Sequence, residues 1–164
     1  MHLNRIYEID AVIKELDDDE TTIYMVDSNI YRERILLSEK AFAYKMKIGA
    51  LKHQGKTLST KGTKQHSADQ IDDTKTQIYR YVRLTYLIPD LLKLVDNSVL
   101  CDKRTYLTIG IKPAVELSYL TKDERNLLYS TFIYDDLTPS HGQAIKIREL
   151  SKNKKLNLFY QWIY

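Results

Sequence analysis

Residues that break helices or cross-link chains are scarce in this sequence. Its 164 residues include three prolines, five glycines and one cysteine. The low Gly and Pro content argues against a loop-rich or all-β fold, and long stretches of good helix formers predict a mostly α protein. The lone Cys101 excludes a disulfide framework and a zinc-binding cysteine pair, so we expect a free thiol in a reducing compartment.

Motifs of common catalytic and metal sites are also missing. The four histidines are scattered, without a pair spaced to ligate a metal, and the sequence has no glycine-rich phosphate loop. No apolar run approaches the roughly 18 residues of a membrane-spanning helix, and the N-terminus lacks the apolar core of a signal peptide. We therefore expect a soluble cytoplasmic protein with no catalytic residues and no metal site.

Charge is unevenly distributed along the chain. Residues 1–39 contain four basic and ten acidic side chains, residues 40–86 contain ten and three, and residues 87–164 contain eleven and nine. The middle segment therefore carries a net +7 within a chain of net +3. Such a basic block is the footprint expected of a surface that binds a polyanion, although a solvated, lysine-rich face would have the same composition.

The N-terminal segment predicts a strand followed by a helix. Residues 5–16 alternate β-branched and aromatic side chains with charged ones, which is typical of a strand. The acidic run at 17–20 favours a helix start, because the helix dipole attracts negative charge there, and Ile23, Val26 and Ile30 recur on one side. A lone strand needs partners. We therefore expect the end of a larger α/β unit, or a strand that pairs with another chain.

A second helix is expected next. Ser38 can cap the stretch "EKAFAYKMKIGALKHQG", which should end near Gly55. Helical spacing predicts that its core side chains are Phe42, Met46 and Ile48 or Ala50. The following "KTLSTKGTKQ" is polar and has no periodicity, so we expect a basic loop.

Two capping motifs then predict a helix-turn-helix. Ser67 with Gln70 can begin a short helix, and Thr74 with Gln77 can begin a longer one over 74–87. A short helix, a tight turn at the intervening aspartates and a longer helix follow the order of that motif. Proline and capping residues predict four further helices in a compact bundle, beginning at Pro89 (89–96), at Pro113, at Thr121 with Glu124, and at Thr138 with Pro139.

The helix over 74–87 has two distinct sides. At about 100° per residue, the side expected to be buried comprises Ile78, Tyr81, Val82 and Thr85. The opposite side comprises Thr76, Arg80 and Arg83.

Base edges are read by the first turns of the second helix in a helix-turn-helix. The candidate DNA-binding residues are therefore Lys75, Thr76, Gln77 and Arg80, with Arg83 further along. Arg can fork onto guanine, Gln onto adenine, and Thr can touch phosphate or a thymine methyl. A cation at a helix start is disfavoured by the dipole, and a phosphate beside Lys75 would offset this. Lysines of the adjoining loop would add attraction to phosphate: Lys56, Lys61 and Lys64. The alternative is that the arginines are solvated surface charges.

The junction "DSNIYRERILLSE" offers a second candidate site. Asn29 and Arg32 are spaced to lie on one side of a helix end, where they could meet a phosphate. The alternative is an ordinary surface junction.

Four stretches resemble the ParB family of plasmid and chromosome partition proteins, most closely the group carried by plasmids and mobile elements of Gram-positive bacteria. They are "DDDETTIYMVDSNIYRERILLSEKAFAYKMK", "KTQIYRYVRLTYLIPDLLKLVD", "KPAVELSYL" and "TPSHGQAIKIREL". The resemblance covers roughly residues 5–152 in order, with several independent motifs at compatible spacing.

The resemblance implies a DNA-binding clamp. In that family an N-terminal domain binds CTP with Mg²⁺, a helical domain recognises a centromere-like DNA site through a helix-turn-helix, and a further domain dimerises. A ParA-type ATPase is the usual partner. The helix over 74–87 would be the recognition helix, and Asn29 and Arg32 would contact nucleotide phosphate and metal. The family's Gly-x-Arg-Arg motif is absent from the printed sequence, and Ser28, Tyr31 and Leu37 replace residues usual around Asn29. These departures count against both CTP binding and CTP hydrolysis by this chain, so CTP and Mg²⁺ are cofactors only as far as the resemblance implies them.

We thus expect a truncated ParB-like protein, with a nucleotide-binding remnant over 1–37, a helical DNA-binding domain over 38–152 and a hydrophobic tail over 153–164. Its expected function is sequence-specific binding of double-stranded DNA in partition, on the nucleoid or a plasmid. One alternative is a CTP-dependent clamp whose missing motif comes from a partner chain, and a homodimer is an alternative assembly. Another is an interaction protein or remnant that modulates a full-length ParB homologue.

Overall fold

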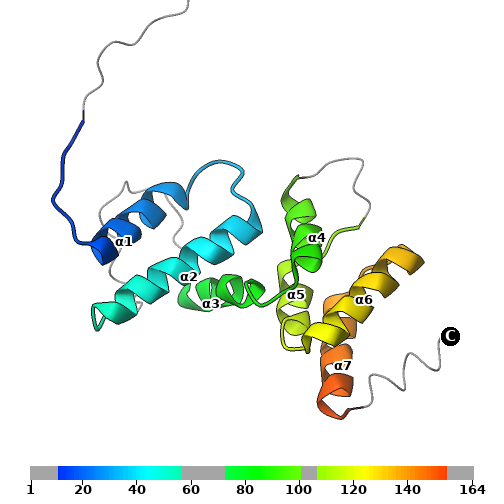
Figure 1. Cartoon of the computed structure of the whole chain (residues 1–164). Coiled ribbons are helices and arrows are strands. Elements are labelled where there is room, and N and C mark those ends of the chain that lie inside the picture. The colour runs from blue at the N-terminus through cyan, green and yellow to red at the C-terminus, as the bar shows by residue number, and fades with distance from the viewer. Residues whose placement is uncertain (1–10, 57–72, 101–106, 155–164) are drawn as a thin grey trace, which may run out of the picture.

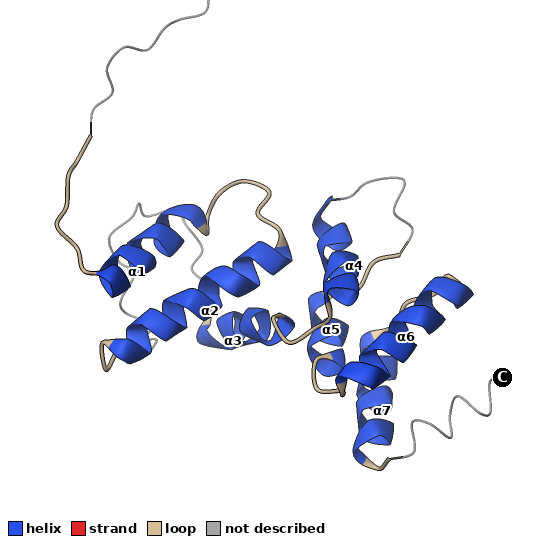
Figure 2. Ribbon diagram, viewed as in Figure 1, coloured by secondary structure: helices blue, strands red, loops and turns tan. Residues whose placement is uncertain are grey.

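Seven α-helices make up the part of the chain that this computed structural model describes, namely residues 11–56, 73–100 and 107–154. They are α1 (Asp18–Asn29), α2 (Leu37–His53), α3 (Lys75–Leu84), α4 (Pro89–Leu100), α5 (Ile111–Leu117), α6 (Lys122–Asp135) and α7 (His141–Lys152). No strand occurs among these residues (Figure 2). The prediction of a mostly α protein is therefore confirmed.

The predicted strand over 5–16 is wrong for residues 11–16, which are exposed and irregular. An isolated strand leaves its backbone groups unpaired, and no strand elsewhere in the described ranges offers them partners. The remaining residues of that prediction, 5–10, lie outside the described ranges, so of the expected strand and helix the described residues contain only the helix, α1.

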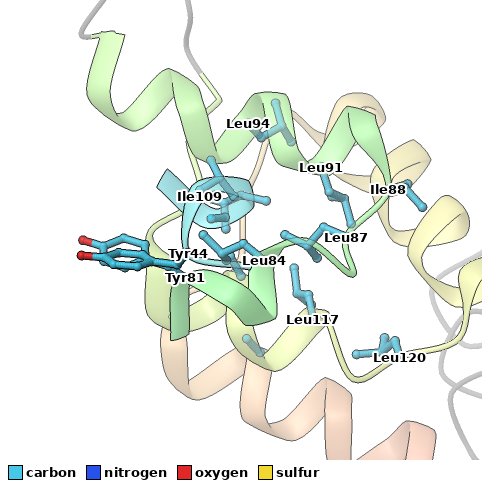
Figure 3. Packing of buried hydrophobic residues seen from close by; sticks show 14 of the residues in the cluster. Tyr44, Tyr81, Leu84, Leu87, Ile88, Leu91, Leu94, Ile109, Leu117 and Leu120 are labelled. Carbon is cyan, nitrogen blue, oxygen red and sulfur yellow. The ribbon is translucent and has the colours of Figure 1, made fainter. Parts of the chain in front are cut away.

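The helices form two neighbouring groups that share one core (Figure 1). In the first group α2 packs against both α1 and α3, and in the second α5 packs against α7. Contacts of α2 with α4 and of α3 with α5 join the groups. Figure 3 shows the side chains at this junction, where Leu84 of α3 lies close to Leu87 and Leu117. The position of α3 is thus fixed from both sides.

Helix α1 begins as its acidic sequence predicts. The carboxylate of Asp17 caps it by accepting a hydrogen bond of 2.7 Å from the backbone N–H of Glu20, and three acids occupy the first turn. Val26 and Ile30 are buried and Ile23 is half-buried, so the predicted inner side is confirmed.

Helix α2 begins and packs differently from its prediction. Its N-cap is Leu36, whose N–H donates to the Glu39 carboxylate (3.1 Å). Ser38 lies inside the helix and its N–H donates to Asp96 Oδ1 of α4 (2.8 Å). The predicted core residues Phe42 and Met46 are about half exposed, at 47% and 48%.

The buried side of α2 is instead formed by small and amphipathic residues, namely Ala41, Tyr44, Lys47 and Ala50. Alanines let α1 and α3 approach closely, while the Tyr and Lys stems are buried and their polar tips find partners. Ile48, the alternative core position, is half-buried. The helix ends just before Gly55, which has a left-handed φ of +66°, so the predicted end is confirmed.

Two of the later helix starts agree with the sequence. Helix α4 begins at Pro89 and continues to Leu100, beyond the predicted end at 96. Helix α6 has the predicted reciprocal cap, in which Thr121 N–H donates to Glu124 Oε2 (2.8 Å) and Glu124 N–H donates to Thr121 Oγ1 (3.3 Å).

The start of α7 was predicted two residues too early. Its N-cap is Ser140, which forms a reciprocal cap with Gln143. Thr138 instead donates its hydroxyl to the carbonyl of Thr108 (2.8 Å) and ties two loops together. The Ser-x-x-Gln spacing satisfies two orphan N–H groups, which Thr138 could not do. Pro113 is the third residue of α5 rather than its first.

Helix α3 is anchored to α2 at its N-terminal end. The rings of Tyr44 and Tyr81 stack at 5.8 Å between centroids, with their hydroxyls pointing the same way (Figure 3). The Tyr44 hydroxyl donates to Asp73 Oδ2 (2.6 Å), just before α3, and Lys40 Nζ lies 2.5 Å from the same carboxylate oxygen. Lys40 also lies over the Tyr81 ring, 4.8 Å from its centroid. These four residues fix where α3 starts.

We expect Tyr44→Phe to change how stability depends on alkaline pH. Burial, and then the hydrogen bond to Asp73 and its charge, raise the pKa of Tyr44 well above its ordinary value near 10. The contribution of the Tyr44 hydroxyl to the free energy of unfolding is therefore complete below about pH 10. Above that pH it declines by up to about 1.4 kcal/mol per pH unit, because only the unfolded chain loses the proton. In urea unfolding at pH 8, 10 and 11, the stability advantage of wild type over Tyr44→Phe should shrink above pH 10. An advantage that is constant over this range would contradict the prediction.

Candidate nucleic-acid interface

Helix α3 begins at the residue that the sequence predicted. Thr74 Oγ1 accepts a hydrogen bond of 3.3 Å from Gln77 N–H. The reciprocal half of the cap is not formed, because the Gln77 amide Nε2 contacts the Tyr81 hydroxyl at 3.4 Å instead. The helix ends at Leu84 rather than at 87, and Leu87 and Ile88 beyond it are buried. The predicted short helix from Ser67, and Lys61 and Lys64, lie outside the described residues.

The buried side of α3 is rotated slightly from the predicted one. Ile78 and Tyr81 are buried as expected, and Leu84 is completely buried. Val82 and Thr85, which were predicted to be inside, are only half-buried. The difference arises because α3 packs against α2 on one side and α5 on another, so its contact surface is wider than one stripe.

Three of the predicted DNA-binding residues are exposed on the opposite side of α3. They are Lys75, Thr76 and Arg80. The side chains of Lys75 and Arg80 form no ion pair or hydrogen bond with any residue that the structure describes. The helix sequence "KTQIYRYVRL" contains no acid to neutralise them. Gln77 is half-buried, with its amide directed to Tyr81.

Arg83 lies in a different environment. Its Nη2 donates to the carbonyl of Ser118 (3.1 Å), directly after α5. Its guanidinium carbon lies 3.9 Å from the ring centroid of Tyr119 and 4.6 Å from that of Tyr86. Arg83 therefore joins α3 to the second helix group, and the structure separates it from the unpaired side chains of the first turns.

Sequence reasoning missed the aromatic part of this surface. Tyr79 and Tyr86 are half exposed beside the basic residues, at 50% and 53%. Lys45 of α2 lies over Tyr86, 5.7 Å from its ring centroid. Lys56 is exposed after α2, with its Nζ donating to Gln54 Oε1 (2.9 Å). Charged residues interleaved with tyrosines within "KTQIYRYVRLTY" were the signal for this arrangement.

No protein-family model, curated protein or solved structure matches this chain. The likeness to ParB proteins therefore stays a prediction from the quoted motifs. None of the described helices has the length and apolarity to cross a bilayer.

The second predicted site, at Asn29 and Arg32, lies at the C-terminal end of α1. The Asn29 amide donates to the carbonyl of Met25 (2.8 Å), and Arg32 N–H donates to the carbonyl of Asn29 (3.1 Å). Both side chains are exposed. The negative end of a helix dipole is unfavourable for phosphate. The described residues also contain no group of His, Cys, Asp and Glu arranged to hold a metal.

Proposed function

We propose that this protein binds double-stranded DNA with sequence preference, by inserting the first turns of α3 into a major groove. The observation that carries the proposal is the division of α3 into two sides. One side is held in the core by Ile78, Tyr81 and Leu84, while Lys75 and Arg80 on the other are exposed and without acidic neighbours on the helix. A rigid helix with unpaired cations at its N-terminal end suits groove insertion.

The exposed side chains of α3 indicate how the protein would recognise the bases and phosphates of the duplex. Arg80, one turn into the helix, can donate two parallel hydrogen bonds to guanine O6 and N7. Thr76 can contact a thymine methyl or a phosphate. Lys75 stands at the positive end of the helix dipole, where a backbone phosphate would be bound by the dipole and the ammonium group together. The surrounding basic residues, Lys45 and Lys56, would add sequence-independent attraction.

The resemblance to ParB proteins supplies the biological part of the proposal. It favours a centromere-like DNA site on a plasmid or chromosome, a role in partition and a ParA-type ATPase as partner. The N-terminal anchor of α3, formed by Asp73, Tyr44 and Lys40, supports a recognition role because base readout requires a fixed helix. Selection of bound fragments from random duplex DNA at two salt concentrations tests the proposal. Recovery of one shared sequence supports it, and recovery of unrelated fragments contradicts it.

Arg80→Ala should weaken binding to the selected site by about 1–3 kcal/mol and relax specificity at one base pair. Lys75→Ala should weaken selected and scrambled duplexes alike and reduce the slope of log K against log salt by about 1, because it removes a phosphate contact. The measurement is fluorescence anisotropy with both duplexes at several salt concentrations. Lys93→Ala, an exposed lysine on α4, is the matched control for lost charge. Unchanged affinity of Arg80→Ala for its selected site would remove the base-reading role.

A further inference from the structure

Three arginines from three helices gather around the turn that follows α5. The guanidinium carbons of Arg83 on α3 and Arg148 on α7 lie 3.9 and 3.7 Å from the ring centroid of Tyr119. Arg125 on α6 donates from Nε to the carbonyl of Thr121 (3.2 Å), at the end of the turn whose first carbonyl, that of Ser118, accepts from Arg83 (3.1 Å). Burial, and then the charge of Arg83, lower the pKa of Arg125. These three residues are called the arginine cluster below.

Acidic partners are too few for this cluster. Arg148 Nη1 pairs with Glu116 Oε2 at 2.7 Å. Neither Arg83 nor Arg125 forms an ion pair with an acid in the described ranges. The nearby Glu124 carboxylate accepts hydrogen bonds from Thr121 N–H (2.8 Å) and the Ser151 hydroxyl (2.9 Å). Of the three guanidinium groups, only that of Arg148 has an ion-pair partner among the described residues.

Many of the hydrogen-bond donors of the cluster are unused. A guanidinium has five N–H donors. Arg83 donates to the Ser118 carbonyl, and Arg125 Nε donates to the Thr121 carbonyl (3.2 Å). Arg83 Nε, Arg125 Nη1 and Arg148 Nε are buried without any partner. Buried unpaired donors and adjacent like charges both cost free energy. All three side chains are half-buried, so an anion with several acceptor oxygens at their exposed parts would offset the repulsion between the like charges.

We infer that the arginine cluster binds a phosphate group. Planar, always charged guanidinium groups match the oxygen geometry of phosphate. The ring of Tyr119 holds two of them in place, so that less side-chain freedom is lost on binding. Arg83 is on the same helix as the proposed groove-binding residues, three positions after Arg80, and its side chain extends from them towards the second helix group. The phosphate is therefore a backbone phosphate of the same duplex, and in this respect the inference rests on the proposed function.

Two substitutions, one in the arginine cluster and one at the carboxylate paired with it, should have opposite effects on DNA affinity. Arg125→Gln removes a cation and should weaken binding to selected and scrambled duplexes roughly tenfold, with the salt slope reduced by about 1. Glu116→Gln removes the competing carboxylate and should tighten binding to both several-fold. Lys93→Gln on α4 is the control for lost charge. A merely structural role would weaken binding in both variants. Thermal unfolding of each variant identifies any variant that fails to fold. In that case the change in DNA affinity of the other variant, measured alone, tests the inference.

A second experiment tests the arginine cluster with inorganic phosphate as the probe and does not depend on DNA binding. Titration of phosphate into the full chain, followed by ¹⁵N NMR of the arginine Nε–H resonances, should shift the signals of Arg83 and Arg148. Arg125→Gln should abolish or weaken these shifts. If duplex binding is absent but these shifts occur, the phosphate site stands and the proposed function fails. If the duplex binds, yet neither variant changes its affinity and phosphate shifts none of these resonances, the inference is overturned.

Discussion

Leu84→Ala should lower the free energy of unfolding by about 2–5 kcal/mol. Leu84 is fully buried and lies where α3 meets the second helix group, beside Leu87 and Leu117 (Figure 3). Truncation removes the transfer free energy of its methyl groups and leaves a cavity that helices held from two sides cannot close. Single domains have only about 5–15 kcal/mol of stability, so this one change would remove a large share.

Urea unfolding followed by circular dichroism measures this effect. Leu137→Ala is a suitable control, because Leu137 is 68% exposed and the same truncation there should change stability by no more than about 0.5 kcal/mol. A loss below about 1 kcal/mol for Leu84→Ala would mean that the junction between the helix groups is loosely packed. Leu84→Met, which conserves volume, should cost less than about 1.5 kcal/mol.

Local signals in the sequence predicted the helix starts well. Thr74 and Thr121 cap the helices that they were expected to cap, and α1 begins at the acidic run that favours a helix start. A cap depends on a side chain and a backbone N–H three residues away, so its determinants are contained in a few residues. The error at α7 has the same origin, since two neighbouring residues, Thr138 and Ser140, can each cap a helix and only the second has Gln three residues later.

The packing of α2 could not be predicted from its apolar pattern. Phe42 and Met46 have the more hydrophobic side chains, yet Tyr44 and Lys47 are buried in their place. The choice depends on partners distant in the sequence: the Tyr44 hydroxyl meets Asp73, and Lys47 meets Asp27. A periodicity analysis treats such amphipathic residues as polar and assigns them to the surface.

The candidate interface was predictable where it depends on one helix and not where it combines several. The exposure of Lys75, Thr76 and Arg80 follows from the position of Ile78 and Tyr81 on the opposite side. The environment of Arg83 does not, because Ser118 and Tyr119 lie some 35 residues further along the chain. The arginine cluster likewise depends on how α3, α6 and α7 meet, which no local pattern encodes.

Asp27→Asn should destabilise the protein by about 2–3 kcal/mol, because it leaves the Lys47 ammonium largely buried without a counter-charge. Lys47 of α2 and Asp27 of α1 form an ion pair, and their side chains are only 11% and 23% exposed. Removing one partner of a fully buried pair costs about 3–5 kcal/mol, and the residual exposure of this pair lowers the expected value. At the surface, Asp90→Asn breaks the exposed Lys93–Asp90 pair and should cost no more than about 1 kcal/mol.

Replacing both partners separates the cost of an unpaired charge from the contribution of the pair itself. The double variant Asp27→Leu with Lys47→Met keeps similar side-chain volume and removes both charges, so it should be more stable than either single variant and within about 1 kcal/mol of wild type. Urea unfolding of the four proteins in this double-mutant cycle gives the coupling free energy directly. If the double variant loses as much as the two single variants together, the coupling free energy is zero, and the expected cost of leaving one charge unpaired is contradicted.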